Sequence, residues 1–403
     1  MRKRTIYLVG AGMGNLSGLT GAANSAIAES DILFGAKRLL DSIAPAGKQA
    51  VAVYQPQEIK AALSGLPETK VAAVLLSGDI GFYSGAKRIV EAFPEDNVVG
   101  IPGLSSLQYF CAKEKKAWET VRLISLHGRR ENLISALRRY PEIFLLTGGE
   151  QTVSSVCRRL AQYGYGDAFV RIGENLSSAE ERIFRGRAEE FCSLEPASLS
   201  VMLIEQKDFH PSVVTPGLPD RLFERGNVPM TKSEVRSVTL SRLRLRPGDI
   251  VYDIGAGTGS VSVEAALQAE NGAVYAVECR DTALELIEKN KLKFGCENIT
   301  VVAGKAPEAL EGLPAPDRVF LGGTSGQTEE ILTRLVDRSG SFRVVANAVT
   351  VETLSHTLSV LEKLGFQEIE AVQIAVTPLE KRGCYHMMSA QNPVFVISAD
   401  WER

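Results

Sequence analysis

The sequence of 403 residues lacks several features that would set its chemistry or its location. Its six cysteines are scattered, with no CxxC pair and no histidine at metal-ligand spacing, so we expect free thiols and no metal site. No apolar run approaches the ~18 residues of a membrane span. The apolar stretch Ile6–Val9 is too short for a signal peptide. We therefore expect a cytoplasmic protein without a membrane partner.

An excess of positive charge is also missing. Residues 1–220 carry 25 Lys and Arg against 24 Asp and Glu, and residues 221–403 carry 20 against 24, so the halves have net charges of +1 and −4. A nucleic-acid-binding domain usually carries a clear basic excess. We therefore expect no nucleic-acid partner.

Strand-like and helix-like segments alternate along the first half. Helical periodicity is seen at 84–93, 131–140 and 150–163, between apolar runs typical of strands. Such alternation predicts parallel sheets covered by helices, an α/β fold. The pattern stops near Gln206, where three prolines and a glycine follow, and we predict domains at 1–205 and 223–403 joined by a linker at 206–222.

The second half resumes the alternation. A leading helix at 235–245 is followed by five strand-like runs, IVYDIGAG, AVYAVE, ITVVAG, DRVFLGG and FRVVAN, and by a helix at 351–364. Two last strand-like runs, at 366–376 and 393–399, are joined without a helix-length segment. We therefore expect them to form an antiparallel pair at the edge of an otherwise parallel sheet.

The phrase DIGAGTGS in the second half has the features of a nucleotide-binding turn. Asp253 ends a strand, three glycines make the turn, and Glu278 closes the next strand, where a carboxylate can accept hydrogen bonds from ribose hydroxyls. The spacing Gly-x-Gly-x-Gly behind an aspartate favours S-adenosylmethionine, because a carboxylate suits a cationic sulfonium better than a pyrophosphate. A dinucleotide site and a purely structural turn remain alternatives.

The second half also resembles a known family. The run from ERGNVPMTKSEVRS to the glycine turn, with VECRDTALELIEKN and VVAGKAPEAL, is similar to the C15-methyltransferase/decarboxylase subunit of cobalamin biosynthesis. The resemblance implies a Rossmann-like class I S-adenosylmethionine methyltransferase fold. It also implies that the methyl donor contacts Thr231, Gly255, Ala256, Gly257, Thr258, Gly259, Glu278 and Ala306.

The similar phrase GAGMGN in the first half lacks both acids, so it fails as a mononucleotide site by the same reasoning. Four polar loops follow later strands, at 77–85, 100–108, 125–130 and 145–151, and could converge at one sheet edge. In this order the loops resemble the tetrapyrrole methylases, above all their C5-methyltransferase member, with a fold of two α/β subdomains. The resemblance implies donor contacts from Met13, Asp79, Phe82, Ser105 and Ser106, with Gly10 and Gly12 shaping the floor of a substrate cleft.

Each of these residues has a simpler interpretation. Asp79, Ser105 and Ser106 could merely cap helices. His127 could contact the substrate or be an ordinary surface histidine. Arg129 and Arg130 could be solvated, or could hold the carboxylates of the polyanionic tetrapyrrole that the resemblance implies, and we favour the second interpretation.

Together the halves resemble the fused precorrin-6Y or cobalt-precorrin C5,15-methyltransferases. This implies one S-adenosylmethionine site per domain, methylation of a precorrin at C5 and C15, loss of the C12 acetate carboxylate, and a homo-oligomer formed through the second domain. The catalytic residues stay unknown, and Thr231, Lys232, His386 and Asn392 are candidates on loops near the second pocket. A silent domain that only binds tetrapyrrole and an RNA-modifying second domain are the competing hypotheses.

Overall fold

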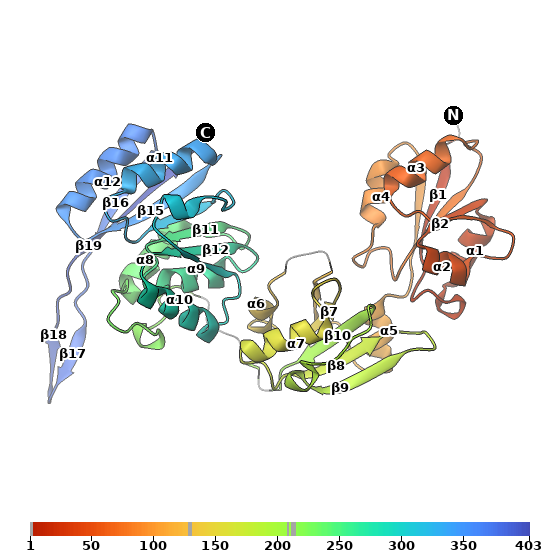
Figure 1. Ribbon diagram of the computed structural model, residues 1–403, viewed down its shortest axis with the longest axis horizontal. Coiled ribbons are helices and arrows are strands. Elements are labelled where there is room, and N and C mark those ends of the chain that lie inside the picture. The colour runs from red at the N-terminus through yellow and green to blue at the C-terminus, as the bar shows by residue number, and fades with distance from the viewer. Residues whose placement is uncertain (1–2, 128–130, 208, 211–214) are drawn as a thin grey trace. The chain divides into compact units, whose positions relative to one another are not determined.

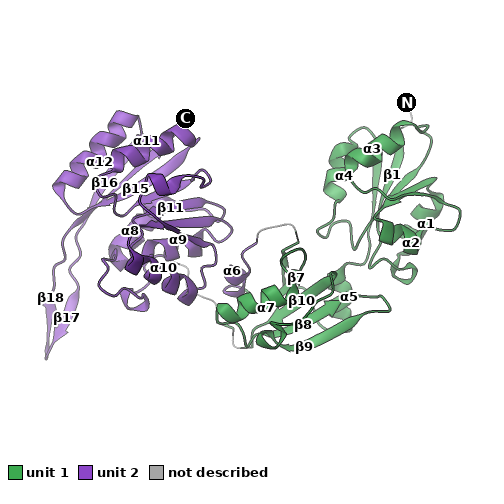
Figure 2. Cartoon of the chain, in the orientation of Figure 1, with its two compact units in different colours: residues 1–130, 140–209 green, residues 131–139, 210–403 purple. Residues whose placement is uncertain are grey.

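A computed structural model describes residues 3–127, 131–207, 209–210 and 215–403. The chain divides into two compact units, which Figure 2 shows in green and purple. Unit 1 contains residues 1–130 and 140–209, and unit 2 contains residues 131–139 and 210–403. The short segment 131–139 therefore groups by its contacts with the second unit, whereas the domain boundaries at 205 and 223 stay a prediction.

The first sheet of unit 1 is entirely parallel, as expected, with strand order β3-β2-β4-β1-β5. Its strands are β1 (Thr5–Gly10), β2 (Ile32–Gly35), β3 (Gln49–Val51), β4 (Ala72–Leu76) and β5 (Asn97–Ile101). The helices between them are α1 (Gly21–Glu29), α2 (Lys37–Ile43), α3 (Pro56–Ser64) and α4 (Ala86–Ala92), with a short 3₁₀ turn, η1 (Leu16–Gly18). The central strands are buried on both faces, which explains their continuous apolar sequence.

The second sheet of unit 1 corrects the expectation of parallel sheets. Its order is β6-β7-β10-β8-β9, and only β6 and β7 are parallel. Its elements are β6 (Arg122–Ser125), β7 (Glu142–Leu146), β8 (Phe169–Glu174), β9 (Arg182–Arg187) and β10 (Ser200–Glu205), with α5 (Ser106–Lys113), α7 (Val153–Gln162) and η2 (Ala188–Phe191). Strand β9 reads RIFRGR, so its charge hid it from the apolar pattern.

Unit 2 is built on a seven-stranded sheet of order β13-β12-β11-β14-β15-β19-β16 (Figure 1). The strands are β11 (Ile250–Ile254), β12 (Ala273–Glu278), β13 (Ile299–Ala303), β14 (Arg318–Leu321), β15 (Phe342–Ala348), β16 (Gln367–Ile374) and β19 (Val394–Trp401). The first five are parallel, and β19 pairs antiparallel with both β15 and β16, which confirms the predicted antiparallel edge.

The helices of unit 2 are α6 (Leu133–Leu137), α8 (Ser233–Leu243), α9 (Ser260–Gln268), α10 (Asp281–Lys293), α11 (Thr328–Arg338) and α12 (Val351–Leu364), with the 3₁₀ turns η3 (Asp220–Leu222) and η4 (Glu308–Leu310). A hydrophobic core lies on each face of the sheet. The loop between β16 and β19 contains an unexpected two-stranded hairpin, β17 (Leu379–Arg382) with β18 (Tyr385–Met388). Figure 1 shows this hairpin extending away from the rest of unit 2.

None of the helices in the described ranges is both long and apolar enough to cross a bilayer.

Candidate functional site

The glycine turn after β11 takes a conformation that few other residues could adopt. Gly255, Gly257 and Gly259 all have positive φ angles, of 75°, 58° and 74°. A Cβ atom on Gly255 would lie 2.4 Å from the carbonyl oxygen of Gly323 in the loop after β14. The turn can therefore pass close to the neighbouring loop only because Gly255 carries no side chain.

A cavity of about 800 Å³ opens at the carboxyl ends of the parallel strands in unit 2. It is bounded by the glycine turn, the ends of β12, β14 and β15, the segment before α8, and the loop before β19. This is the edge of an α/β sheet at which ligands bind. Of the residues expected to hold the donor, seven line the cavity: Thr231, Gly255, Ala256, Gly257, Thr258, Glu278 and Ala306.

The remaining candidates in unit 2 divide between the cavity and other positions. Gly259 is the N-cap of α9 rather than a lining residue. Among the catalytic candidates, Lys232 and Asn392 line the cavity together with Thr231. His386 lies in the exposed strand β18, paired with Lys381, and is not among the lining residues. The structure thus brings three of the four candidates together.

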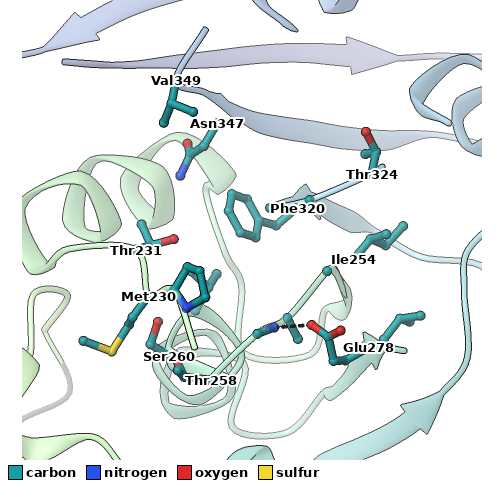
Figure 3. A pocket seen from close by; sticks show the side chains of 18 of the residues that line it. Met230, Thr231, Ile254, Thr258, Ser260, Glu278, Phe320, Thr324, Asn347 and Val349 are labelled. Carbon is teal, nitrogen blue, oxygen red and sulfur yellow. Dashed lines mark hydrogen bonds between the residues drawn. The ribbon is translucent and has the colours of Figure 1, made fainter. Parts of the chain in front are cut away.

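Glu278 joins the end of β12 to the glycine turn. Its Oε2 accepts a hydrogen bond of 2.9 Å from Gly257 N, drawn as a dashed line in Figure 3. Its Oε1 accepts from the backbone N–H groups of Cys279 (2.9 Å) and Arg280 (3.1 Å) and from Arg280 Nε (3.2 Å). Burial alone would raise the pKa of this carboxyl, but these hydrogen bonds hold the pKa below its ordinary value. The carboxylate is therefore charged and fixed in position.

Asp253 does not act as the sequence suggested. Its side chain is buried and is not among the cavity-lining residues, and Oδ2 accepts a hydrogen bond from Ser262 in α9. Burial, with the nearby charge of Glu278, raises its pKa to about 7 although Ser262 opposes the shift. The expectation that this acid faces the donor is wrong, because the side chain turns toward α9.

A buried ion pair holds the segment that leads into the cavity. Arg236 of α8 is fully buried, and its Nε lies 2.5 Å from Glu264 Oε1 in α9. Glu264 also accepts from the N–H groups of Gly217 (2.6 Å) and Leu218 (3.1 Å). Arg236 Nη1 donates to the carbonyl of Thr231 over 2.5 Å. The pair therefore fixes the backbone of a lining residue, and sequence reasoning missed it because both residues look like surface charges on helices.

Sequence reasoning also missed cavity-lining residues near the ends of β14 and β15. Phe320 and Thr324 flank the end of β14, and Asn347 lies near the end of β15 (Figure 3). The available signal was a polar residue or a glycine pair at the end of an apolar strand, in VFLGGT and VVAN. These residues line the same cavity as Thr231.

The glycines of the segment GAGMGN in unit 1 are needed for a different reason. A Cβ atom on Gly10 would lie 2.5 Å from Gly103 N, and one on Gly103 would lie 2.4 Å from Gly78 O and 2.5 Å from Gly10 O. Gly12 and Gly78 also pair in an isolated bridge. The loops after β1, β4 and β5 thus meet backbone to backbone, which leaves no room for a side chain at Gly10 or Gly103, while Gly78 is favoured by its φ of 73°.

Asp79 fastens the same loops. Its Oδ2 accepts from Gly103 N (3.0 Å), and its Oδ1 accepts from Gly81 N (2.8 Å). Ser105 is the N-cap of α5 in a capping box with Gln108, and Ser106 is the first residue of that helix. Ser105 therefore caps a helix as the simpler interpretation expected, whereas Asp79 does not cap α4, whose N-cap is Gly85, and instead connects two loops. Their contact with a methyl donor stays a prediction.

The other candidates of unit 1 are placed as follows. The Phe82 ring lies 6.3 Å from that of Phe144 in a hydrophobic cluster, and Met13 is half-buried in the first glycine loop. His127 is exposed at the end of β6, where a Cβ atom on Gly148 would collide with its ring. Arg129 and Arg130 lie outside the described residues.

Comparisons with known proteins match both halves of the chain. Residues 5–192 match the model of the tetrapyrrole (corrin/porphyrin) methylases, and residues 221–400 match the model of the precorrin methyltransferase domain.

Named relatives match one half or most of the chain. The "Probable cobalt-precorrin-6B C(15)-methyltransferase (decarboxylating)" of Pyrobaculum calidifontis is 48% identical over 46% of this chain and 96% of its own. The Salmonella typhimurium "Cobalt-precorrin-6B C(15)-methyltransferase (decarboxylating)" is 39% identical over the same shares. A Sinorhizobium "Precorrin-6Y C(5,15)-methyltransferase [decarboxylating]" is 29% identical over 89% of this chain and 88% of its own.

Proposed function

The chain belongs to the family of fused precorrin-6Y C5,15-methyltransferases (decarboxylating), and from this premise we propose how its two units share the work. It is an S-adenosylmethionine-dependent methyltransferase of cobalamin biosynthesis whose reaction includes a decarboxylation. Unit 1 methylates C5 of the precorrin macrocycle. Unit 2 methylates C15 and removes the carboxylate of the C12 acetate side chain. Each unit has its own donor site.

The cavity of unit 2 supports the second assignment. Gly255 and Gly257 carry no side chains, so a ligand in the cavity can approach the backbone of the turn closely. Glu278, charged and held at the end of β12, is placed to accept the ribose hydroxyls. Thr258 lines the cavity, and its buried hydroxyl has no hydrogen-bond partner among the described residues. The residues that line the cavity therefore fit S-adenosylmethionine, and this fit is the observation that carries the proposal.

The protein's contribution to methyl transfer is alignment rather than acid–base chemistry. S-adenosylmethionine supplies an electrophilic methyl group on a sulfonium, and the reduced macrocycle supplies a nucleophilic carbon. What remains for the chain is to hold both in line in a cavity from which water is excluded. Thr231, Lys232 and Asn392 border the cavity and are the candidates for contact with the macrocycle or for a proton donor.

Unit 1 is supported by its fold and by the meeting of its loops. The contact of the loops after β1, β4 and β5 places Met13, Asp79, Ser105 and Ser106 at the carboxyl edge of the first sheet. We propose that Gly10 and Gly12 form the floor beneath the substrate there. Phe82 completes the donor contacts, and His127, with Arg129 and Arg130, binds the substrate.

The experiment that tests the proposal measures the mass of the product as well as the rate of its formation. Purified chain is incubated with S-adenosylmethionine and precorrin-6Y, with and without cobalt, and the product is expected to gain two methyl groups and lose one CO2. Glu278→Ala is expected to stop the C15 methylation and spare C5, and Asp79→Ala the reverse. Loss of both methylations in either variant would contradict independent sites. Transfer of a labelled methyl group to bulk tRNA is measured in parallel, and its detection would support an RNA substrate.

We propose in addition that copies of the chain associate through unit 2. The hairpin β17–β18 pairs only with itself among the described strands, and it exposes four large apolar side chains: Leu379, Tyr385, Met387 and Met388. An exposed apolar hairpin of this kind is a typical site of pairing between copies. A cytoplasmic location likewise stays a prediction.

A further inference from the structure

We propose that Asn347 contacts the substrate in unit 2, where its side-chain amide orients the carboxylate that leaves as CO2. The inference rests on the proposed function of unit 2 and adds to it a residue outside the donor-binding set. Asn347 comes from β15, lines the cavity, and is not one of the residues that the sequence suggested.

The amide of Asn347 is held at one end and has no partner at the other. Oγ1 of Thr239, buried in α8, lies 3.1 Å from Asn347 Oδ1 and shares its one proton between this oxygen and the carbonyl of Val235 at 2.9 Å. The Nδ2 atom is buried and has no hydrogen-bond partner among the described residues. Figure 3 shows Nδ2 directed toward the space between Thr231 and Phe320. A fixed amide thus presents two unused N–H bonds to the cavity.

An unused buried donor is costly, so most such groups in native proteins have a partner. Asn347 lies in the cavity lining, so a bound ligand with an acceptor atom can supply a partner to its buried Nδ2. The ligand group must be an acceptor, because an amide nitrogen donates and does not accept. Carboxylate oxygens of the precorrin are the strongest acceptors that the proposed reaction brings to this cavity.

The position of Asn347 along the sheet separates it from the expected site of the methyl donor, S-adenosylmethionine. The ribose partner Glu278 ends β12, the glycine turn follows β11, and β14 lies between β11 and β15. Three strand spacings of ~4.8 Å place β15 roughly 14 Å from β12. Asn347 therefore lies beyond the adenosine end of the site, on the side where the methyl acceptor must enter.

A neutral amide suits a carboxylate that must leave as neutral CO2. In the decarboxylation the C–C bond to the carboxylate breaks, its electron pair passes into the conjugated macrocycle, and the product takes up one proton from solvent. A lysine or arginine would bind the starting carboxylate strongly and would lose that ion pair as the charge moves into the ring. Asn347 can orient the group between Phe320 and Thr231 at a smaller cost to the barrier.

The test compares two variants of Asn347 in the full-length chain, one that removes the side-chain amide and one that keeps its size. Asn347→Ala removes the donor, and CO2 release from precorrin-6Y is expected to fall at least tenfold. Asn347→Asp keeps the shape but places a negative charge opposite the carboxylate, and a further fall of at least tenfold is expected at pH 8, with partial recovery toward pH 5. Donor affinity, measured by equilibrium dialysis of labelled S-adenosylmethionine, should stay within twofold, and C5 methylation should be unchanged.

Three results would overturn the inference. If CO2 release is unchanged in Asn347→Ala, the amide does not act on the substrate. If Asn347→Asp is no slower than Asn347→Ala, no anion faces the residue, and if donor affinity falls more than fivefold the amide serves the donor instead. Should both variants unfold, Thr239→Val provides the second measurement: it frees the amide, and an unchanged rate would contradict an orienting role. A native chain without CO2 release would instead refute the proposed function.

Discussion

The backbone N–H of Gly257 lies 2.9 Å from Oε2 of Glu278 and donates a hydrogen bond to it. This bond connects the turn after β11 with the end of β12, and the same carboxylate accepts two further backbone N–H groups and the guanidinium of Arg280. The acid therefore organises the turn as well as offering acceptors to a ribose. Its replacement should affect donor binding through both roles.

Glu278→Gln tests this double role with a side chain of the same shape. An amide has only one acceptor oxygen, so at least one backbone N–H would face an N–H₂ group. We expect the affinity of unit 2 for S-adenosylmethionine to fall at least tenfold and C15 methylation to fall with it. Titration calorimetry should show two donor sites in the native chain and one in the variant. Glu288→Gln, an exposed change on α10, is the control, and an unaltered affinity in Glu278→Gln would contradict the assignment.

Gly103→Ala tests the backbone contact between the loops of unit 1. The new Cβ atom would lie 2.4 Å from Gly78 O, so the loops must separate, and we expect unit 1 to lose about 1–3 kcal/mol of stability together with C5 methylation. Gly85→Ala is the matched control, because its φ of −77° suits alanine and no atom lies within 4 Å of the new Cβ. The chain has two tryptophans, and Trp118 reports on unit 1 once Trp401 is replaced by phenylalanine.

Asp253→Asn should change how the stability of unit 2 depends on pH. Because the pKa of this acid is raised from 3.8 to about 7 by burial, the folded state binds the proton more tightly than the unfolded state does. The native chain therefore loses stability as pH rises from about 4 to 7, by at most about 4 kcal/mol at ~1.36 kcal/mol per pKa unit.

Asparagine does not titrate, so the stability of the variant relative to the native chain should rise over the same pH range. Urea unfolding at pH 5 and pH 8, followed by Trp401 in a Trp118→Phe background, measures the difference. A relative stability that is constant between the two pH values would show that Asp253 titrates normally.

The sequence was most informative where function and local structure use the same residues. The order of strand, glycine turn, helix, strand and acid predicted both the turn at Gly255 and the place of Glu278, because each step depends only on neighbouring residues. The bounds of α12, at 351 and 364, were predicted for the same reason, from its local periodicity.

The rest depended on contacts between distant segments. The burial of Arg236 is set by Glu264 on another helix, and even the direction of the Asp253 side chain depends on how the following helix, with Ser262, packs against β11. In the second sheet of unit 1, β10 inserts between β7 and β8, which no pattern in the sequence of those strands specifies. Pairing of this kind follows from the packing of the whole unit.

Glu264→Gln should destabilise unit 2 because it removes one charge of a buried pair. Arg236 would remain fully buried with only the partly exposed Asp220, 3.3 Å from Nη1, as an anionic partner, and breaking a buried pair typically costs about 3–5 kcal/mol. Arg236→Met combined with Glu264→Leu should recover part of that loss. Lys363→Ala breaks an exposed ion pair with Glu329 and should cost no more than about 1 kcal/mol. If Glu264→Gln and Lys363→Ala lowered the free energy of unfolding in urea by the same amount, burial would not determine how much each ion pair contributes to stability.

Charged residues on the hairpin should weaken self-association. Leu379 and Met388 are paired across β17 and β18 and are exposed by 64% and 79%, so Leu379→Glu with Met388→Lys replaces apolar surface without removing a buried contact. Sedimentation velocity is expected to show a smaller species than the native chain, with donor affinity unchanged. The same double change at exposed Leu292 and Val351, which do not line the cavity, is the control. An unaltered sedimentation coefficient would place the interface elsewhere.

The contact of Gly10, Gly78 and Gly103 has a consequence for how sequence variation in this family is interpreted. Gly10 and Gly103 are more than ninety residues apart and accept no side chain because their backbones meet, and Gly78, whose carbonyl oxygen completes the contact, has a positive φ of 73°. In a mutational scan each would score as intolerant as a ligand-binding residue, and an alignment would present GAGMGN as a nucleotide motif. Paired substitutions could tell the two causes apart: once one glycine contact is lost, a second change at its partner should cost little more, whereas residues that bind a ligand independently should each add their own loss.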